Sequence, residues 1–168
     1  MFVNQATGVI TGLNFGGDDG ADTFLNSGTM TTLSFGGGAD DDVLVNRGAV
    51  TTLVFGGDQE FSGGSLQAIP DASDDGADTL LNYGTVTTLQ FVGGADDDIL
   101  VSNGTVGTLI FNGGADDDTL QNNGKVVALQ FTGGADDDVL MNNADGVTTI
   151  EFTGDDGVDS LVNKGSNI

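Results

Sequence analysis

The chain consists of seven copies of one unit of about 20 residues, and this repetition limits its fold more than any other feature. Each copy is marked by a phenylalanine, and most of these phenylalanines are 20 residues apart. They are Phe15, Phe35, Phe55, Phe91, Phe111, Phe131 and Phe152. A fixed period of this length is typical of a solenoid, in which each repeat forms one coil that buries its apolar face only against its neighbours.

Within each unit, apolar and polar residues alternate with a period of two, as in the segments 89–91 and 98–102. Such alternation predicts half-buried strands, and no stretch of the chain shows a helical period. We therefore expect an all-β fold, a parallel β-solenoid of the β-roll or β-helix type. It should have 20 residues per coil and about seven coils, with like residues stacked in columns along its axis.

The period is interrupted once, by 16 added residues at 58–73. We expect residues 1–168 to form a single solenoid domain, with the insertion 58–73 emerging as a loop on one face. Its apolar residues Phe61, Leu66 and Ile69 would either fold back on the solenoid, which we favour, or contact a partner. Neither end of the chain resembles a polar cap. We therefore expect a segment of a larger repeat protein, flanked by further repeats.

The composition excludes several classes of function. The net charge is −23, and only Arg47, Lys125 and Lys164 are basic, so nucleic acid and anionic membranes would be repelled. Cysteine is absent, which excludes disulfides and thiolate chemistry. The N-terminus has neither a basic region nor a long apolar run. We therefore expect no signal peptide and no insertion into a membrane.

A polar column stands eleven residues after each phenylalanine, and a glycine usually follows two positions later. The column contains Asn26, Asn46, Asn82, Ser102, Asn122, Asn142 and Asn163. Asparagine at a stacked turn can bond both the backbone and the asparagine of the next coil, so we expect a structural ladder. The glycines are Gly28, Gly48, Gly84, Gly104, Gly124 and Gly165, and we expect them to adopt positive φ.

The loop after each phenylalanine carries three aspartates, which in seven loops make 21 of the 26 acidic residues. The last aspartate of each loop is invariant: Asp22, Asp42, Asp78, Asp98, Asp118, Asp138 and Asp159. An earlier aspartate of the same loop is the candidate second ligand: Asp19, Asp40, Asp75, Asp96, Asp116, Asp136 and Asp156. Stacking would place all of these carboxylates along one edge of the solenoid.

Carboxylates stacked about 5 Å apart repel one another by on the order of 1 kcal/mol per pair even in a high dielectric. A surplus of hard oxygen ligands without nitrogen or sulfur favours Ca²⁺. We therefore predict several Ca²⁺ ions between adjacent loops, bound by these aspartates and by loop carbonyls. The alternative is a solvated acidic edge that holds no ions.

The loop and the strand after it resemble the Ca²⁺-binding nonapeptide of the RTX (repeats-in-toxin, haemolysin-type) family, G-G-x-G-x-D-x-U-x. Residues 93–101, GGADDDILV, match this pattern except that Asp96 stands at the position of the fourth-place glycine. Residues 154–162, GDDGVDSLV, keep that glycine but have Asp155 at the second position. The resemblance implies a right-handed parallel β-roll with Ca²⁺ between loops, and a bacterial protein that is secreted and folds outside the cell.

These observations favour a Ca²⁺-binding structural module of a secreted or cell-surface protein such as an adhesin. The alternative is a solenoid that binds ice or another ligand through its threonine columns or through the insertion. The threonines that precede the core leucine are Thr11, Thr31, Thr32, Thr51, Thr52, Thr87, Thr88, Thr108, Thr148 and Thr149. We expect no enzyme, because the loops are nearly alike and no acid or base stands apart from them.

Overall fold

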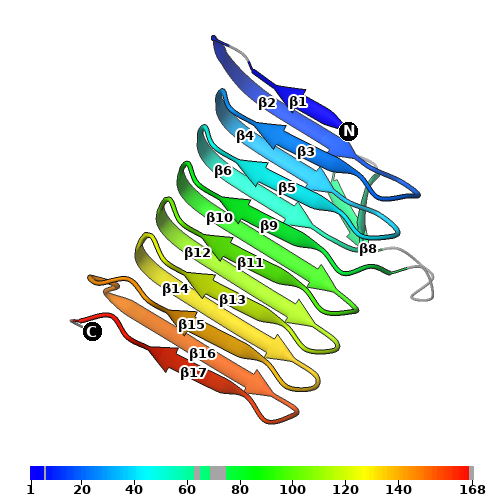
Figure 1. Ribbon diagram of the computed structural model, residues 1–168. Helices are drawn as coiled ribbons and strands as arrows, with labels where there is room; N and C mark the ends of the chain where they lie inside the picture. The colour runs from blue at the N-terminus through cyan, green and yellow to red at the C-terminus, as the bar shows by residue number, and fades with distance from the viewer. Residues whose placement is uncertain (6, 63–64, 69–74, 167–168) are drawn as a thin grey trace.

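The protein is a parallel β-solenoid whose coils stack along one axis (Figure 1). The computed structural model describes residues 1–5, 7–62, 65–68 and 75–166. All regular secondary structure in these residues is β, and none of it is helical. Each coil contains one short strand and one longer strand, which belong to two different sheets. The expected fold class and the spacing of about 20 residues per coil are confirmed.

The short strands follow the aspartate loops and form one parallel sheet, here called the short-strand sheet. In spatial order they are β1 (Phe2–Asn4), β3 (Thr23–Asn26), β5 (Val43–Asn46), β9 (Thr79–Asn82), β11 (Ile99–Ser102), β13 (Thr119–Asn122), β15 (Val139–Asn142) and β17 (Ser160–Asn163). From β3 to β15 the apolar residue at the second position is buried, and so is the asparagine or serine at the strand end.

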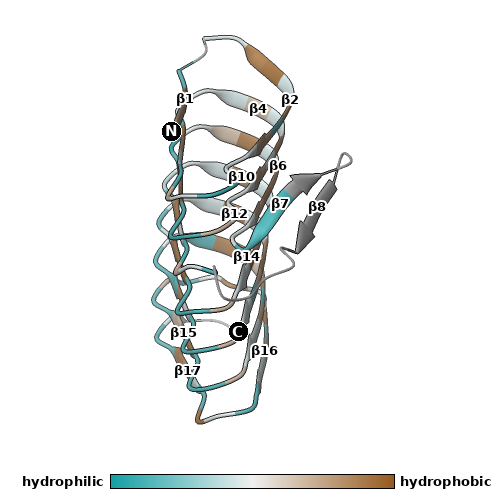
Figure 2. Cartoon of the chain, turned by 90° about the vertical axis from the view of Figure 1, so that its right-hand side faces the viewer, coloured by the Kyte–Doolittle hydropathy of each residue, from teal (hydrophilic) through white to brown (hydrophobic). Residues whose placement is uncertain are grey.

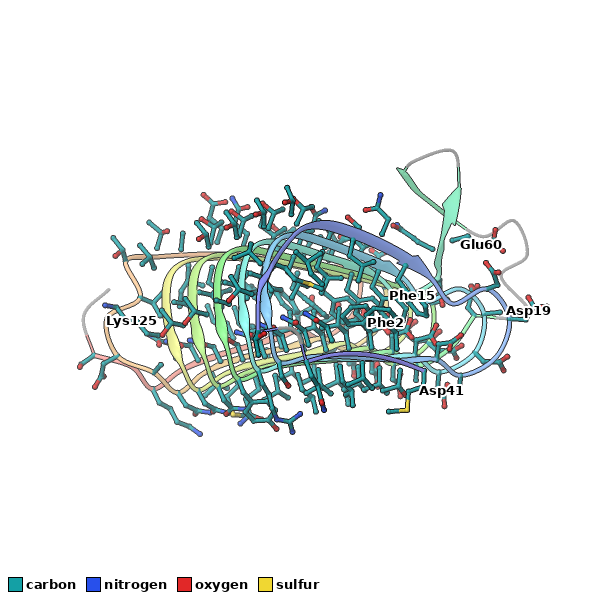
Figure 3. The ribbon with its side chains drawn as sticks, turned by 90° about the horizontal axis from the view of Figure 1, so that it is seen from above. Phe2, Phe15, Asp19, Asp41, Glu60 and Lys125 are labelled. Carbon is teal, nitrogen blue, oxygen red and sulfur yellow. The ribbon has the colours of Figure 1, made fainter. Side chains whose placement is uncertain are left out.

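The longer strands form the opposite layer, here called the long-strand sheet, which is also parallel. They are β2 (Val9–Gly16), β4 (Thr29–Gly36), β6 (Ala49–Gly56), β10 (Thr85–Gly94), β12 (Thr105–Gly114), β14 (Lys125–Gly134) and β16 (Thr149–Asp155). The phenylalanine that marks each repeat lies on these strands and faces the short-strand sheet. Figure 3 shows Phe2 and Phe15 between the two layers.

The repeat columns read from the sequence are the pairing register of the structure. Phe35 lies opposite Phe55 and Phe55 opposite Phe91, with ring centroids 4.8 and 4.9 Å apart. Aromatic rings and leucines thus form continuous ladders, and most of them have no exposed surface. Full burial of each such side chain stabilises the fold by about 1.5–3 kcal/mol. The core residues of the coils at both ends are less buried than those between them.

The insertion leaves the stack of coils unbroken. β6 pairs directly with β10, so the step of 36 residues adds no layer to either sheet. The inserted segment forms an antiparallel hairpin of β7 (Gln59–Ser62) and β8 (Ser65–Ala68), which projects beside the long-strand sheet near β2 and β4 (Figure 2). The side chains of Phe61 and Leu66, and all of Ile69, lie outside the described residues, so the predicted apolar cover stays a prediction.

The expectation that the glycines of the asparagine turns adopt positive φ is wrong. None of Gly28, Gly48, Gly84, Gly104, Gly124 and Gly165 has positive φ. Their role is close approach. A Cβ atom at Gly48 would collide with the carbonyl oxygen of Gly28, and one at Gly84 with that of Gly48. The stacking distance of the coils therefore explains these glycines better than backbone handedness does.

Candidate functional site: the aspartate edge

All aspartate loops lie along one edge of the solenoid, where each long strand turns into the next short strand. Figure 3 shows Asp19 and Asp41 at this edge and Lys125 at the opposite one. The loops appear as a hydrophilic border in Figure 2. The predicted single row of aspartates is therefore present, and the opposite edge is formed by the asparagine turns.

The invariant last aspartates, here called the inner aspartates, point into the solenoid. Five of them, Asp42, Asp78, Asp98, Asp118 and Asp138, have no exposed surface, whereas Asp22 and Asp159 are partly exposed near the two ends. From Asp42 to Asp159, Oδ1 of each inner aspartate accepts a hydrogen bond from the backbone N–H of the inner aspartate one coil earlier. These N–H···Oδ1 bonds run from Asp22 to Asp42 (2.5 Å), Asp42 to Asp78 (2.8 Å), Asp78 to Asp98 (2.8 Å), Asp98 to Asp118 (2.9 Å), Asp118 to Asp138 (2.9 Å) and Asp138 to Asp159 (3.1 Å).

The second oxygen of the inner aspartates is buried without a hydrogen-bond partner. This holds for Oδ2 of Asp42, Asp78, Asp98, Asp118 and Asp138. A buried carboxylate oxygen without a partner is costly, so such atoms require an explanation. Among the described residues, the only ion pair to an inner aspartate joins the N-terminal ammonium and Asp22, at 3.1 Å. No side chain of the described chain therefore neutralises the row.

A glycine packs against each of these second oxygens, which occupy the place that a side chain at that position would take. A Cβ atom at Gly93 would collide with Oδ2 of Asp98, and one at Gly113 with Oδ2 of Asp118. The same relation holds at Gly37, Gly57, Gly133 and Gly154. The first loop glycine is thus required by the inward carboxylate, which explains why Gly-Gly and the last aspartate recur together.

Burial raises the pKa of the five fully buried inner aspartates above the ordinary value. Desolvation raises the pKa of Asp78 to about 9 and that of Asp98 to about 8. It raises the pKa of Asp42 and of Asp118 to about 7, and it also raises the pKa of Asp138. Neighbouring aspartates add to the effect, and the backbone hydrogen bonds oppose it. Without a cation, Asp78 and Asp98 therefore hold a proton at neutral pH.

The structure does not gather the remaining predicted ligands around the inner ones. Asp40, Asp96, Asp116 and Asp136 begin their triplets with φ between 63° and 69° and are exposed. Asp19 and Asp156 are exposed as well, and Asp75 is half-buried. Within the described ranges, no three acidic side chains lie so that they could hold a metal ion. A cation at this edge would thus need backbone carbonyls in addition to the inner carboxylates.

The middle aspartates of the Ala-Asp-Asp-Asp loops have a structural role that the sequence did not suggest. Oδ1 of Asp97 accepts the backbone N–H of Asp117 at 3.0 Å, and Oδ1 of Asp117 accepts that of Asp137 at 2.8 Å. Asp41 and Asp137 do the same for Ala77 and Val158. These exposed carboxylates tie neighbouring loops together, and they differ from the inner row because water reaches them.

Asp58 is a buried acidic residue of this edge that sequence reasoning missed, since it was assigned to the insertion. It is 5% exposed, and its two oxygens accept the backbone N–H groups of Gly76 (3.1 Å) and Ala95 (2.6 Å). Burial raises its pKa to about 6. In the next coils the N–H group equivalent to that of Ala95 donates to a loop carbonyl instead, as the N–H of Ala115 does to the carbonyl of Gly94. The signal was present, because Asp58 follows a Gly-Gly pair just as Asp18 does.

The asparagine edge contains the predicted structural ladder. Nδ2 of one asparagine donates to Oδ1 of the asparagine in the next coil, at 2.8–2.9 Å. One run of these bonds joins Asn4, Asn26, Asn46 and Asn82, and a second joins Asn122, Asn142 and Asn163. The ladder is interrupted at Ser102, whose Oγ is buried without a partner, as is Nδ2 of Asn82. Arg47 lies at this edge, 5.3 Å from the ring centre of Tyr83.

No family model, curated protein sequence or solved structure matches the chain. The resemblance of the loops to RTX repeats therefore rests on the residues quoted above. In the described part of the chain, no helix is long and apolar enough to cross a membrane.

Proposed function

We propose that the protein is a Ca²⁺-binding structural module in which ions lie beside the inner aspartates. One observation carries this proposal, namely the row of buried Oδ2 atoms that have neither a hydrogen-bond partner nor a counter-ion. Carboxylate and carbonyl oxygens are hard ligands, and the chain has no histidine or cysteine to recruit a softer metal. A row of divalent cations would neutralise the carboxylates and link each coil to the next.

The biological setting of this proposal follows from the resemblance to RTX repeats. Such a module would be secreted or displayed at a bacterial cell surface, where Ca²⁺ is plentiful, as part of an adhesin or similar repeat protein. Its coils would stiffen when the ions bind, because binding free energy becomes folding free energy where the site exists only in the folded chain. The module has no catalytic role in this proposal.

Calorimetric titration with Ca²⁺ tests the proposal, with Asp98→Asn as the variant and Asp97→Asn as its matched control. The two residues are adjacent aspartates and the substitution is the same, but Asp98 is buried and Asp97 is exposed. We expect the wild type and Asp97→Asn to take up a similar number of ions. Asp98→Asn should take up fewer, since its carboxylate borders two gaps between loops. Absence of uptake by the wild type at millimolar Ca²⁺ would rule the proposal out.

Ice binding is retained as the second candidate because four threonines lie in register on the outer face of the long-strand sheet. They are Thr32, Thr52, Thr88 and Thr108, and Ala128 ends the row. A thermal hysteresis assay tests this candidate. Activity that disappears in Thr52→Val/Thr88→Val would favour it, and absence of activity in the wild type would exclude it.

A further inference from the structure

The outer face of the short-strand sheet is largely apolar and carries no charged side chain. Side chains on each short strand alternate between core and surface, so the first and third positions face outward. Apolar residues of the third-position column include Val3, Leu25, Leu81, Val101, Met141 and Val162. Val43, Ile99 and Val139 belong to the first-position column. The other members are Val45, which is only 8% exposed, and the uncharged polar residues Thr23, Thr79, Thr119, Gln121 and Ser160. We call these two columns the apolar strip.

The outer face of the long-strand sheet is different, although it belongs to the same coils. Its outward positions include Thr88, Gln90, Gln130 and Glu151, and the hairpin lies beside its N-terminal strands. Exposed apolar residues occur on both sheets, Val9 and Val127 on the long-strand sheet and Val3 and Ile99 on the apolar strip, but only the strip has no charged side chain along its length. A continuous uncharged strip on a chain of net charge −23 is typical of an interaction surface.

The distribution of charge around the strip identifies its occupant. The strip lies between the aspartate edge and the asparagine edge, and the three basic residues Arg47, Lys125 and Lys164 are all at or next to the asparagine turns. A second copy packed face to face can therefore place its aspartate edge over the basic residues of the first. This requires a two-fold axis parallel to the solenoid axis. A two-fold axis parallel to the strands would place aspartate edge over aspartate edge, which is repulsive.

We propose that the apolar strip is the interface of a homodimer with the two-fold axis parallel to the solenoid axis. Eight strands at about 4.8 Å and four residues per strand give a strip of roughly 34 Å by 13 Å, or about 450 Å² on each copy. This is smaller than a standard interface of about 800 Å² per partner, so the dimer is weak, with a dissociation constant in the micromolar range. Because both copies are acidic, salt strengthens it by screening their net repulsion.

Sedimentation equilibrium of the 168-residue chain, in 0.5 M NaCl with and without millimolar Ca²⁺, tests the proposal. The variant is Leu81→Glu/Val101→Glu on the strip, and the control is Gln90→Glu/Ile110→Glu on the opposite face of the same two coils. Both doubles add two charges at positions paired across neighbouring strands. We expect the wild type and the control to dimerise with similar affinity, and the strip variant to dissociate at least tenfold more readily.

The orientation of the two copies is tested separately by cross-linking. The chain has no cysteine of its own, so a single introduced cysteine is the only site of reaction. With the axis parallel to the solenoid, Leu25 lies opposite Leu25 of the second copy. With a two-fold axis parallel to the strands, Leu25 lies opposite Met141 of the second copy. Leu25→Cys should therefore link to itself through a short bis-maleimide, whereas Gln90→Cys on the other sheet should not.

Three results would overturn the proposal: a wild type that stays monomeric at hundreds of micromolar, a dimer that survives Leu81→Glu/Val101→Glu, or preferential linking through Gln90→Cys. Circular dichroism shows in each case whether the variant has kept its β structure. Neither sedimentation equilibrium nor cross-linking depends on the number of ions bound, so failure of the Ca²⁺ proposal and failure of the dimer proposal are distinguishable.

Discussion

The two edges of the solenoid satisfy their buried polar side chains in different ways. Both bury a column of polar side chains in stacked turns, and in both columns one oxygen accepts a backbone N–H. The asparagine amide also has donors, so its Nδ2 reaches the next Oδ1 and the column is closed upon itself. The aspartate carboxylate has only acceptors, so its second oxygen is left without a partner.

The comparison shows why only one edge is a candidate for ion binding. Asparagine can repeat along the axis without help, since each side chain satisfies the one before it. A carboxylate column repeats only if a proton or a cation stands between successive oxygens. The asparagine edge therefore holds the coils in register without help, whereas the aspartate edge makes the stability of the solenoid depend on pH and on bound cations.

The largest effect expected from this difference is produced by removing Ca²⁺. Each site that is saturated at 100 times its dissociation constant contributes about 2.7 kcal/mol, and several sites act together. We expect chelation at pH 8 to lower the melting temperature by tens of degrees or to unfold the chain, as followed by circular dichroism. An unchanged spectrum and melting temperature would show that the inner aspartates need no ion.

The next effect is a pH dependence of the chelated protein. Asp42, Asp78, Asp98 and Asp118 have folded-state pKa values of about 7 to 9 against an ordinary value of 3.8, so the folded state binds more protons than the unfolded chain. Their stabilisation is complete below pH 4 and is lost progressively as the pH rises from about 4 to the folded-state pKa values of about 7 to 9. The slope is about 1.4 kcal/mol per pH unit for each excess proton. Denaturant titrations at pH 5, 7 and 9 measure it.

Matched double variants show which carboxylates cause this dependence. Asp98→Asn/Asp118→Asn removes two buried groups and should flatten the curve. Asp97→Asn/Asp117→Asn removes two exposed neighbours and should leave the slope as it is. If both doubles flatten it equally, the net charge rather than the inner row determines the pH dependence.

Introducing the chemistry of one edge into the other gives a third test. Asn122→Asp would lose the donor to Asn142 and place two acceptors in contact, in a turn with no loop to hold an ion. We expect a loss of about 2–4 kcal/mol in the free energy of unfolding, greatest at high pH and not restored by Ca²⁺. Asn123→Asp, on the exposed neighbour, should cost less than 1 kcal/mol. Rescue of Asn122→Asp by Ca²⁺ would contradict the distinction between the edges.

The fold could be predicted from the sequence because a solenoid uses one pairing rule many times. The phenylalanine spacing fixed both the coil length and the register, in which Phe91 lies opposite Phe111 and Phe131 opposite Phe152. The glycine conformation at the asparagine turns could not be predicted in this way. Positive φ and a carbonyl within contact distance both demand glycine, and a sequence does not distinguish them.

The candidate site was predicted only in part for a similar reason. Invariance among the repeats identified the last aspartate of each loop, which is the residue that the structure buries. Spacing did not reveal that Asp96 and Asp116 face water, because this depends on positive φ at a residue other than glycine. Asp58 was missed because the 16-residue insertion was treated as separate from the loop that it enters.

Asp58 provides a fourth test, in which a point substitution should cost more than a large deletion. Asp58→Ala in the full chain leaves the N–H groups of Gly76 and Ala95 without their carboxylate, a loss of about 2–3 kcal/mol. Deleting residues 58–73 joins Gly57 to Asp74, which restores the 20-residue step between Phe55 and Phe91. The rejoined loop has nearly the sequence of residues 15–22. We expect the deletion variant to fold in Ca²⁺ with a smaller loss. A deletion variant that cannot fold would show that the insertion is part of the core.

The smallest effect concerns the one interruption of the asparagine ladder. Ser102 is too short to reach its neighbours, so its Oγ and Nδ2 of Asn82 are buried without partners. In Ser102→Asn, Oδ1 should accept from Asn82 and Nδ2 should donate to Asn122, as in the coils on both sides. We expect a gain of about 1–2 kcal/mol, equal with and without Ca²⁺, because amides close the column without an ion. Ser102→Ala should change stability by less than 1 kcal/mol. If Ser102→Asn is destabilising while Ser102→Ala is neutral, a buried water already bridges Asn82 and Asn122, and the ladder is closed at this coil as well.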